Sequence, residues 1–219
     1  MKIEGAKISK GLTKNEGISY NKRAMKNNFD EKMQKIIEGL ENKPKLLLHS
    51  CCAPCSSACL ERIAGFFQVT VLYYNPNIDD EGEYEKRKAE QIRFLQATGL
   101  ADIIDCAHEK EKFEAMSKGL EEEPERGKRC YLCYELRLRK TAEVAKQEGF
   151  DYFCTTLTLS PHKNAEWLNE IGYACQEEYG VSYLPSDFKK RGGYLRSLQL
   201  SEQYNLYRQD FCGCKYSKR

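Results

Sequence analysis

Short apolar runs alternate with helical segments along most of the chain, and this alternation limits the folds that it can adopt. Residues 45–50, 67–77, 101–108 and 150–160 have the apolar, β-branched or aromatic character of buried strands. Helical patterns cover residues 29–40, 53–65, 79–99, 134–149 and 164–179, and Gly65, Gly99, Gly149 and Gly180 stop the last four. The sequence therefore predicts an α/β fold, a parallel sheet flanked by helices, with helical additions. Ligands of such sheets bind beyond the carboxyl ends of the strands.

The 219 residues are enough to bury one core, and we expect a single α/β domain over residues 44–219. Residues 1–43 are expected to form a basic N-terminal extension with one helix. The net charge is only +2, but residues 1–28 hold seven Lys and Arg against two Glu, and residues 189–219 hold eight against two acids. Such clusters bind a phosphate backbone or belong to solvated tails, and charge alone leaves both interpretations open.

The cysteine content indicates a metal or redox function rather than a disulfide scaffold. No apolar run approaches the ~20 residues that span a bilayer, and the polar N-terminus does not resemble a secretory signal. We therefore expect a cytoplasmic protein without a membrane partner, whose thiols are kept reduced. Eleven cysteines in such a compartment point to metal ligation or redox chemistry.

Seven of the cysteines fall into three groups, and the other four stand alone. The groups are Cys51, Cys52 and Cys55, then Cys130 and Cys133, then Cys212 and Cys214. The spacing C-x-x-C occurs at Cys52–Cys55 and at Cys130–Cys133, which favours a four-thiolate site assembled across the fold. Zinc and an iron–sulfur cluster use the same ligands, so the ligand type leaves both open. We expect Cys59, Cys106, Cys154 and Cys175 to be small buried hydrophobes.

The C-terminal pair Cys212 and Cys214 has one intervening residue, Gly213. A disulfide across so short a loop is strained and easily reduced. The pair is therefore interpreted as a two-electron store, as two further metal ligands, or as incidental cysteines of a tail.

Several motifs then occur in a familiar order. They are HSCCAPCS, YYNPNI followed by EYEKRK, RCYLCYELRL, TTLTLSPHKN and YRQDFCGCKYS. Over about residues 44 to 217 the chain resembles the cobalamin-independent epoxyqueuosine reductase family, QueH. The resemblance implies an oxidoreductase that reduces epoxyqueuosine to queuosine at the wobble position of tRNA, with an electron donor that the sequence does not identify. It also fits a Rossmann-like fold of the HUP or PP-loop kind.

The resemblance further implies roles for named residues. Cys51, Cys52, Cys130 and Cys133 are similar to the family's 4Fe–4S ligands, and Cys212 and Cys214 to its redox-active pair. Cys55 is left unassigned, available to line the pocket or to hold a second metal ion, iron or another divalent ion. We expect Asn75, Asn77, His162 and Lys163 to be substrate-binding candidates, although turn and helix-start chemistry explains Asn75 and the pair His162–Lys163 equally well.

Three other functions compete with this interpretation. A zinc-stabilised protein that binds tRNA or another nucleic acid without redox chemistry is the main alternative. An ATP-dependent PP-loop enzyme shares the strand–turn–helix arrangement, but its glycine-rich SGGxDS turn is replaced here by HSCCAPCS. A thiol–disulfide oxidoreductase built on CAPC would leave Cys130 and Cys133 without a role.

Overall fold

The computed structural model describes residues 28–217, so the predictions for residues 1–27 lie outside it. The helices are α1 (Phe29–Glu38), α2 (Ala53–Ile63), α3 (Glu81–Thr98), α4 (Lys110–Ser117), α5 (Lys128–Gln147), α6 (Ala165–Tyr179) and α7 (Gly193–Gln203). The strands are β1 (Lys45–Ser50), β2 (Gln68–Tyr73), β3 (Asp102–Asp105), β4 (Tyr152–Thr155) and β5 (Ser182–Tyr183). Two short 3-10 helices, η1 (Thr156–Leu159) and η2 (Lys215–Ser217), complete the elements within this range.

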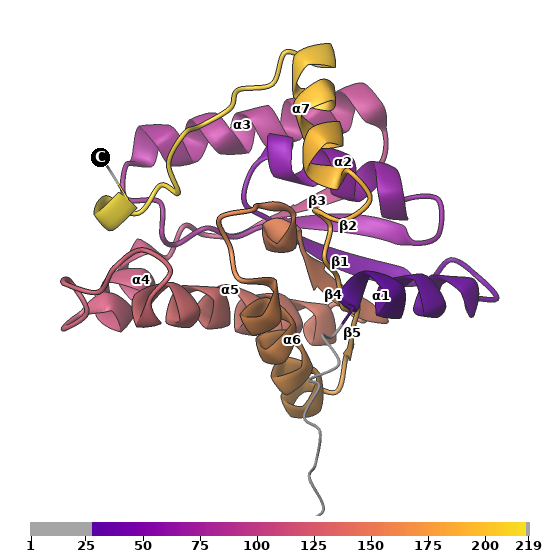
Figure 1. The fold of residues 1–219 in the computed structure, drawn as a ribbon, viewed down its shortest axis with the longest axis horizontal. Helices are drawn as coiled ribbons and strands as arrows, with labels where there is room; N and C mark the ends of the chain where they lie inside the picture. Colours follow the sequence, from indigo (N-terminus) through magenta and orange to yellow (C-terminus); the bar gives the residue numbers. More distant parts are fainter. Residues whose placement is uncertain (1–27, 218–219) are drawn as a thin grey trace, which may run out of the picture.

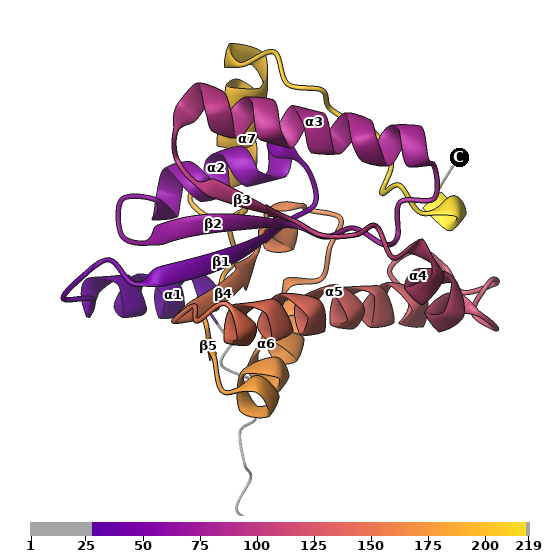
Figure 2. The same cartoon turned by 180° about the vertical axis from the view of Figure 1, so that it is seen from behind.

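The five strands form one parallel sheet in the order β3-β2-β1-β4-β5. Helices α2, α3 and α7 lie on one side of this sheet and α5 and α6 on the other (Figures 1 and 2). Strand β1 is central, and its Leu48 pairs with Val71 of β2 and with Cys154 of β4. The strand order reverses at β1, so the segments that follow β1 and β4 diverge there and leave room for a ligand. The predicted α/β class is confirmed.

Alternate side chains of β1 enter two separate cores. Leu46 and Leu48 belong to the core on the α2 side, whereas Leu47 packs with side chains of α5 and α6. The same alternation turns His49 toward α5 and Ser50 toward α3, where the Ser50 hydroxyl donates to Gln91 Oε1 at 2.8 Å. The strand thus ends with one buried polar side chain on each face.

The strand predicted at residues 150–160 is wrong over its second half. Strand β4 ends at Thr155, whose Oγ1 accepts a hydrogen bond from the Leu157 backbone N–H at 3.1 Å. This side-chain cap starts the helical turn η1, in which Leu157 and Leu159 are still buried. The apolar run therefore marks burial, which a strand and a buried turn share. The sequence also gave no prediction of β5 or α7.

Helix α1 packs against the α/β domain instead of standing apart from it. Its Met33 and Ile37 belong to the same core as Ile63 of α2. Its Asp30 carboxylate binds Arg62 at 2.6 Å and Arg191 at 2.8 Å. Within residues 28–217, no helix has the length and apolar character that crossing a membrane requires.

Candidate metal and redox site

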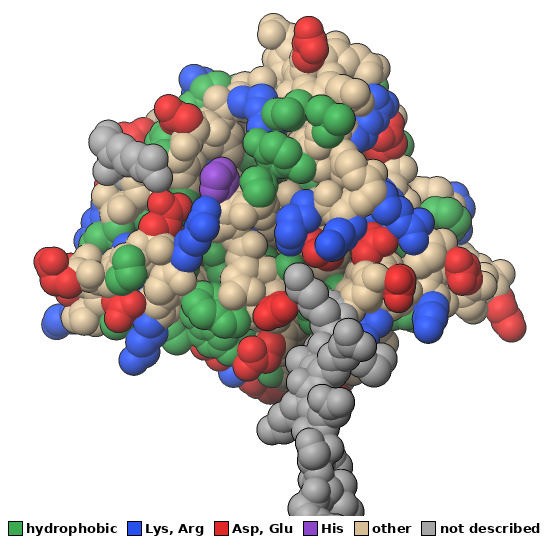
Figure 3. Space-filling view, viewed as in Figure 1, with side chains coloured by type: hydrophobic (Ala, Val, Ile, Leu, Met, Phe, Trp, Pro, Cys, Tyr) green, Lys and Arg blue, Asp and Glu red, His purple; other side chains and the backbone are tan. Residues whose placement is uncertain are grey.

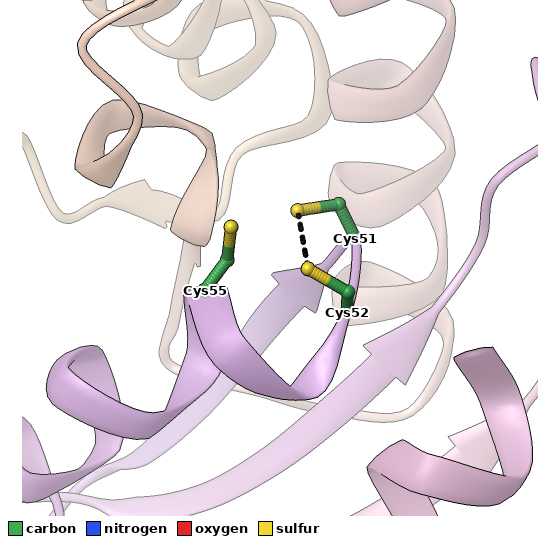
Figure 4. Close-up of side chains that lie close together, drawn as sticks. All are labelled: Cys51, Cys52 and Cys55. Carbon is green, nitrogen blue, oxygen red and sulfur yellow. Dashed lines mark hydrogen bonds between the residues drawn. The ribbon is translucent and has the colours of Figure 1, made fainter. Parts of the chain in front are cut away.

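The first sulfur group lies where β1 gives way to α2. Cys51 and Cys52 occupy the turn after β1, and Cys55 lies in the first turn of α2 (Figure 4). Cys52 is the N-cap residue, and Pro54 lies in the first helical turn, where its missing N–H costs no hydrogen bond. The Sγ atoms of the three cysteines lie within 4.8 Å of one another, and those of Cys51 and Cys52 are 3.7 Å apart. The structure thus brings together three thiols that can hold a metal.

The three thiols differ in their acidity. The pKa of Cys51 lies well below its ordinary range because the thiols of Cys52 and Cys55 donate hydrogen bonds to it. The same hydrogen bonding, together with burial, raises the pKa of Cys52 to about 12 and that of Cys55 well above its ordinary value. One thiolate stabilised by two thiols is the protonation state that this group favours without a metal.

The other two cysteine groups line one pocket between the start of α5 and the C-terminal segment, and we call these four residues together the second sulfur group. Four cysteines contribute to its wall, together with Lys163 and His162; they are Cys130, Cys133, Cys212 and Cys214. The Cys130 Sγ accepts a hydrogen bond from the Arg126 backbone N–H at 3.3 Å, and burial raises the pKa of Cys133 to about 11. Neither Cys130 nor Cys133 lies within the 4.8 Å group formed by Cys51, Cys52 and Cys55.

Buried contacts fix the C-terminal segment over this pocket. The Arg87 guanidinium of α3 donates to the backbone carbonyls of Cys212 at 3.2 Å and Phe211 at 3.4 Å. The Gly213 carbonyl accepts from the Asp79 N–H at 3.0 Å. Gly213 has φ +104°, and a Cβ there would lie 3.0 Å from the Ile78 side chain, so both conformation and space require glycine.

The same segment reaches the first sulfur group through Gln209, whose side chain donates a hydrogen bond to Cys52. Residues far apart in the sequence therefore enclose both sulfur groups as one site.

Cys212 is the ionised member of the C-terminal pair. Its pKa is held well below the ordinary range because the Cys214 thiol donates a hydrogen bond to it and because Lys163 and Arg137 are positive. The Lys163 Nζ lies 3.7 Å from Cys212 Sγ, and Asn77 Nδ2 lies 3.9 Å from it. The hydrogen bond to Cys212 and burial raise the pKa of Cys214, which keeps its proton.

A buried polar network lies beneath the sulfur groups. Arg137 of α5 donates from Nε to His49 Nε2 at 3.2 Å and from Nη2 to Asn75 Oδ1 at 2.6 Å. Asn75 Nδ2 donates to the Ser50 carbonyl at 3.0 Å, so both ends of its amide are used within the protein. Burial and the Arg137 charge lower the pKa of His49 to about 3, and the ring is neutral. Asn75 and His49 therefore support the site from below.

The other substrate-binding candidates border the pocket. Asn77 is buried, and its Oδ1 has no hydrogen-bond partner within residues 28–217, so it can accept a hydrogen bond from a ligand. His162 is exposed at the pocket rim, where its Nδ1 lies 2.9 Å from Arg126 Nη2.

Sequence reasoning missed Arg137, Arg87, Arg126 and Gln209. Arg137 follows Cys133 by one helical turn, and this spacing was a usable signal for an inward position. Arg87 lies in a run of charged residues on α3, where nothing distinguishes a buried cation from a solvated one. Burial as small hydrophobes is confirmed for Cys59, Cys154 and Cys175, whereas Cys106 is half-buried.

Comparison with known proteins agrees with this arrangement. Residues 46–219 match the family model described as "Epoxyqueuosine reductase QueH". Proteins of that name from Staphylococcus epidermidis and Streptococcus pyogenes serotype M1 are 44% and 39% identical. The first alignment covers 87% of this chain and 84% of the relative, and the second covers 99% and 85%.

A similar fold occurs in the U34-tRNA thiolase NcsA from Methanococcus maripaludis, solved with its [4Fe-4S] cluster. The TM-score is 0.54 at 14% identity, over 87% of this chain and 67% of that one. At this identity the likeness concerns the fold, whereas the sequence matches concern the family. By those matches the chain is an oxidoreductase and belongs to the epoxyqueuosine reductase QueH family.

Proposed function

We propose that this protein removes the epoxide oxygen of epoxyqueuosine in tRNA and so forms queuosine, the last step in making that nucleoside. The observation that carries the proposal is the pair Cys212 and Cys214, a thiolate and a thiol in one pocket beside the Lys163 ammonium. The family names of the relatives give the substrate.

The Cys212–Cys214 pair can supply the two electrons and one of the two protons that the reaction consumes. Conversion of an epoxide to an alkene breaks two C–O bonds and takes up two electrons and two protons, and the oxygen leaves as water. Oxidation of the Cys212 thiolate and the Cys214 thiol to a disulfide releases two electrons and one proton. Lys163 lies beside Cys212 and can deliver the second proton to the oxygen as the C–O bond breaks. Electrons and protons then balance.

The cysteines of the site fit a 4Fe–4S cluster. Such a cluster needs cysteine thiolates in a setting that tolerates negative charge, and both sulfur groups adjoin two cations, the buried Arg137 and the partly buried Lys163. We propose Cys51, Cys52, Cys130 and Cys133 as its ligands. When bound, the cluster supplies single electrons from an external donor, which the disulfide needs to return to its dithiol form.

Cys55 offers a second ligand set. It lies with Cys51 and Cys52 in the three-thiol group, whereas Cys130 and Cys133 do not. Three thiolates could bind three of the four irons of a cluster, or could hold a separate divalent metal ion such as iron, which would polarise the epoxide oxygen as a Lewis acid. Both ligand sets include Cys51 and Cys52, but only the second set includes Cys55.

The surface around the pocket offers contacts for tRNA. Lys and Arg side chains gather across the middle of the face seen in Figure 3, beneath the apolar side chains over α7. Two C-terminal cations are already paired, since Lys189 binds Asp187 at 2.5 Å and Arg196 binds Glu61 at 2.6 Å. Arg126 and His162 at the pocket rim have no acidic partner among residues 28–217. We propose that this pair contacts a phosphate of the nucleotide whose base enters the pocket.

The direct test is conversion of the modified nucleoside. Protein reconstituted anaerobically with iron and sulfide is given a low-potential reductant and tRNA carrying epoxyqueuosine. Mass spectrometry of the digested tRNA should show queuosine, lighter by one oxygen atom, and the same mixture without reductant should not. A colourless protein with stoichiometric zinc and no conversion would support the alternative, a zinc-stabilised protein that binds nucleic acid.

Cluster ligation is tested by iron content. Cys→Ala at Cys51, Cys52, Cys130 or Cys133 should each remove most of the cluster iron, because alanine offers no ligand atom. The control is Cys175→Ala, which removes a buried thiol in the α5–α6 core and should keep full iron and sulfide. Full iron in Cys130→Ala and Cys133→Ala, with loss in Cys55→Ala, would instead assign the cluster to the three-thiol group.

The C-terminal pair is tested by turnover. Replacing Cys212 and Cys214 together by serine should leave iron and sulfide unchanged while multiple turnover collapses, because the two electrons lose their source. Normal turnover in the double variant would contradict the redox role. Loss of one iron per protein would show that the pair ligates a second metal.

The ionisation of Cys212 is tested by alkylation of the reduced, metal-free protein. Lys163→Met removes a neighbouring positive charge, so the pKa of Cys212 should rise toward its ordinary value. Below the pKa, labelling by iodoacetamide should slow about tenfold for each unit of that rise. Lys140→Met, a change at a cation that pairs with Glu143, is the control and should follow the wild-type pH profile. Identical profiles for the two variants would contradict the assignment.

A further inference from the structure

The guanidinium of Arg137 is buried in the centre of the protein with uncharged hydrogen-bond partners. Arg137 is 1% exposed and projects from α5, one turn after Cys133. Its Nε donates to His49 Nε2 and its Nη2 to Asn75 Oδ1. Both acceptors are neutral groups, so these bonds orient the guanidinium without compensating its charge.

None of the ion pairs found between residues 28 and 217 includes Arg137. A buried cation without a counter-ion is strongly destabilising, because the lost hydration is not replaced. An arginine does not escape this cost by losing its proton, because its guanidinium stays protonated in proteins. The fold therefore requires an anion close to Arg137.

The groups that can supply this negative charge are sulfur atoms, which are anionic thiolates when they bind a metal. Those that act on Arg137 are the thiols of Cys133, Cys51 and Cys212. Cys51 and Cys133 belong to different sulfur groups, one after β1 and the other on α5. Arg137 lies one helical turn from Cys133, and its acceptors His49 and Asn75 hold it beside the end of β1, where Asn75 also binds the carbonyl of Ser50, the residue before Cys51.

We infer that Arg137 is the fixed counter-charge of the metal–thiolate site, a positioning residue that holds the anionic cluster and raises its reduction potential. The inference rests on the proposed function. A cluster with thiolate ligands gains a further negative charge when it is reduced, and a nearby buried cation stabilises the more negative state. His49 and Asn75 then serve to hold the guanidinium in place.

The experiment compares Arg137→Gln, Arg137→Lys and the control Arg139→Gln after anaerobic reconstitution. Arg139 is on the same helix, but it pairs with the surface carboxylates of Glu135 and Glu178. Far-UV circular dichroism checks folding, iron and sulfide are counted per protein, and a dye titration followed by electron paramagnetic resonance gives the midpoint potential. These measurements do not involve tRNA.

Arg137→Gln should bind the cluster about 10- to 100-fold more weakly, as expected for loss of a supporting residue, and the fraction that binds should have a lower potential. Arg137→Lys keeps the charge and should stay closer to the wild type in potential. Arg139→Gln should match the wild type in both. A folded Arg137→Gln with wild-type iron and an unchanged potential overturns the inference.

Asn75→Asp provides a second route if Arg137→Gln fails to fold. It places a carboxylate against the guanidinium at nearly constant shape, and the potential should again fall because the positive charge is neutralised. An unchanged potential in Asn75→Asp overturns the inference. If the wild-type protein holds zinc and no iron, the proposed function fails, and the zinc content of the same variants decides whether Arg137 holds the anionic site.

Discussion

Parallel pairing of β1 with both β2 and β4 is the constraint on which the site depends. Because the three strands point the same way, the segments after Ser50, Tyr73 and Thr155 all emerge at one edge of the sheet. Those segments carry Cys51 and Cys52, Asn77, and Lys163. Helix α5 runs along β1 and β4 and brings Cys133 to the same edge. A different strand order would scatter these side chains.

The C-terminal pair cannot reach this edge through the sheet, because no strand follows β5 within the described range. Contacts with α3 and the loop before it bring it there instead. Arg87 is itself held by Glu83 at 2.6 Å, and the Tyr207 hydroxyl donates to the same carboxylate at 3.0 Å. The helix that covers one face of the sheet thereby also positions the redox pair, which couples the packing of α3 to the geometry of Cys212.

Much of this could be predicted from the sequence, and the failures have physical causes. Alternating strands and helices fix the α/β class, and the position of HSCCAPCS after the first strand places the first sulfur group at the carboxyl edge. The spacing Cys52–Cys55 favoured a four-thiolate site shared with Cys130 and Cys133, whereas the structure groups Cys55 with Cys51 and Cys52. The sequence does not reveal which hydrogen-bond partner each polar side chain has in the folded protein. Asn75 looked like a ligand contact, but its amide is used on both sides by Ser50 and Arg137.

Charge balance explains why a lysine, and not a neutral donor, lies beside Cys212. Burial lowers the pKa of Lys163, but Cys212, Tyr134 and Cys51 together outweigh this effect and the net shift is upward, so the ammonium and the Cys212 thiolate stabilise each other. In the proposed reaction, disulfide formation removes the thiolate. The partly buried ammonium would then have one anion fewer beside it, which lowers its pKa and favours release of its proton. The departing oxygen needs a proton at that moment. Thiolate and ammonium therefore disappear together, and disulfide formation does not leave the Lys163 charge without its partner.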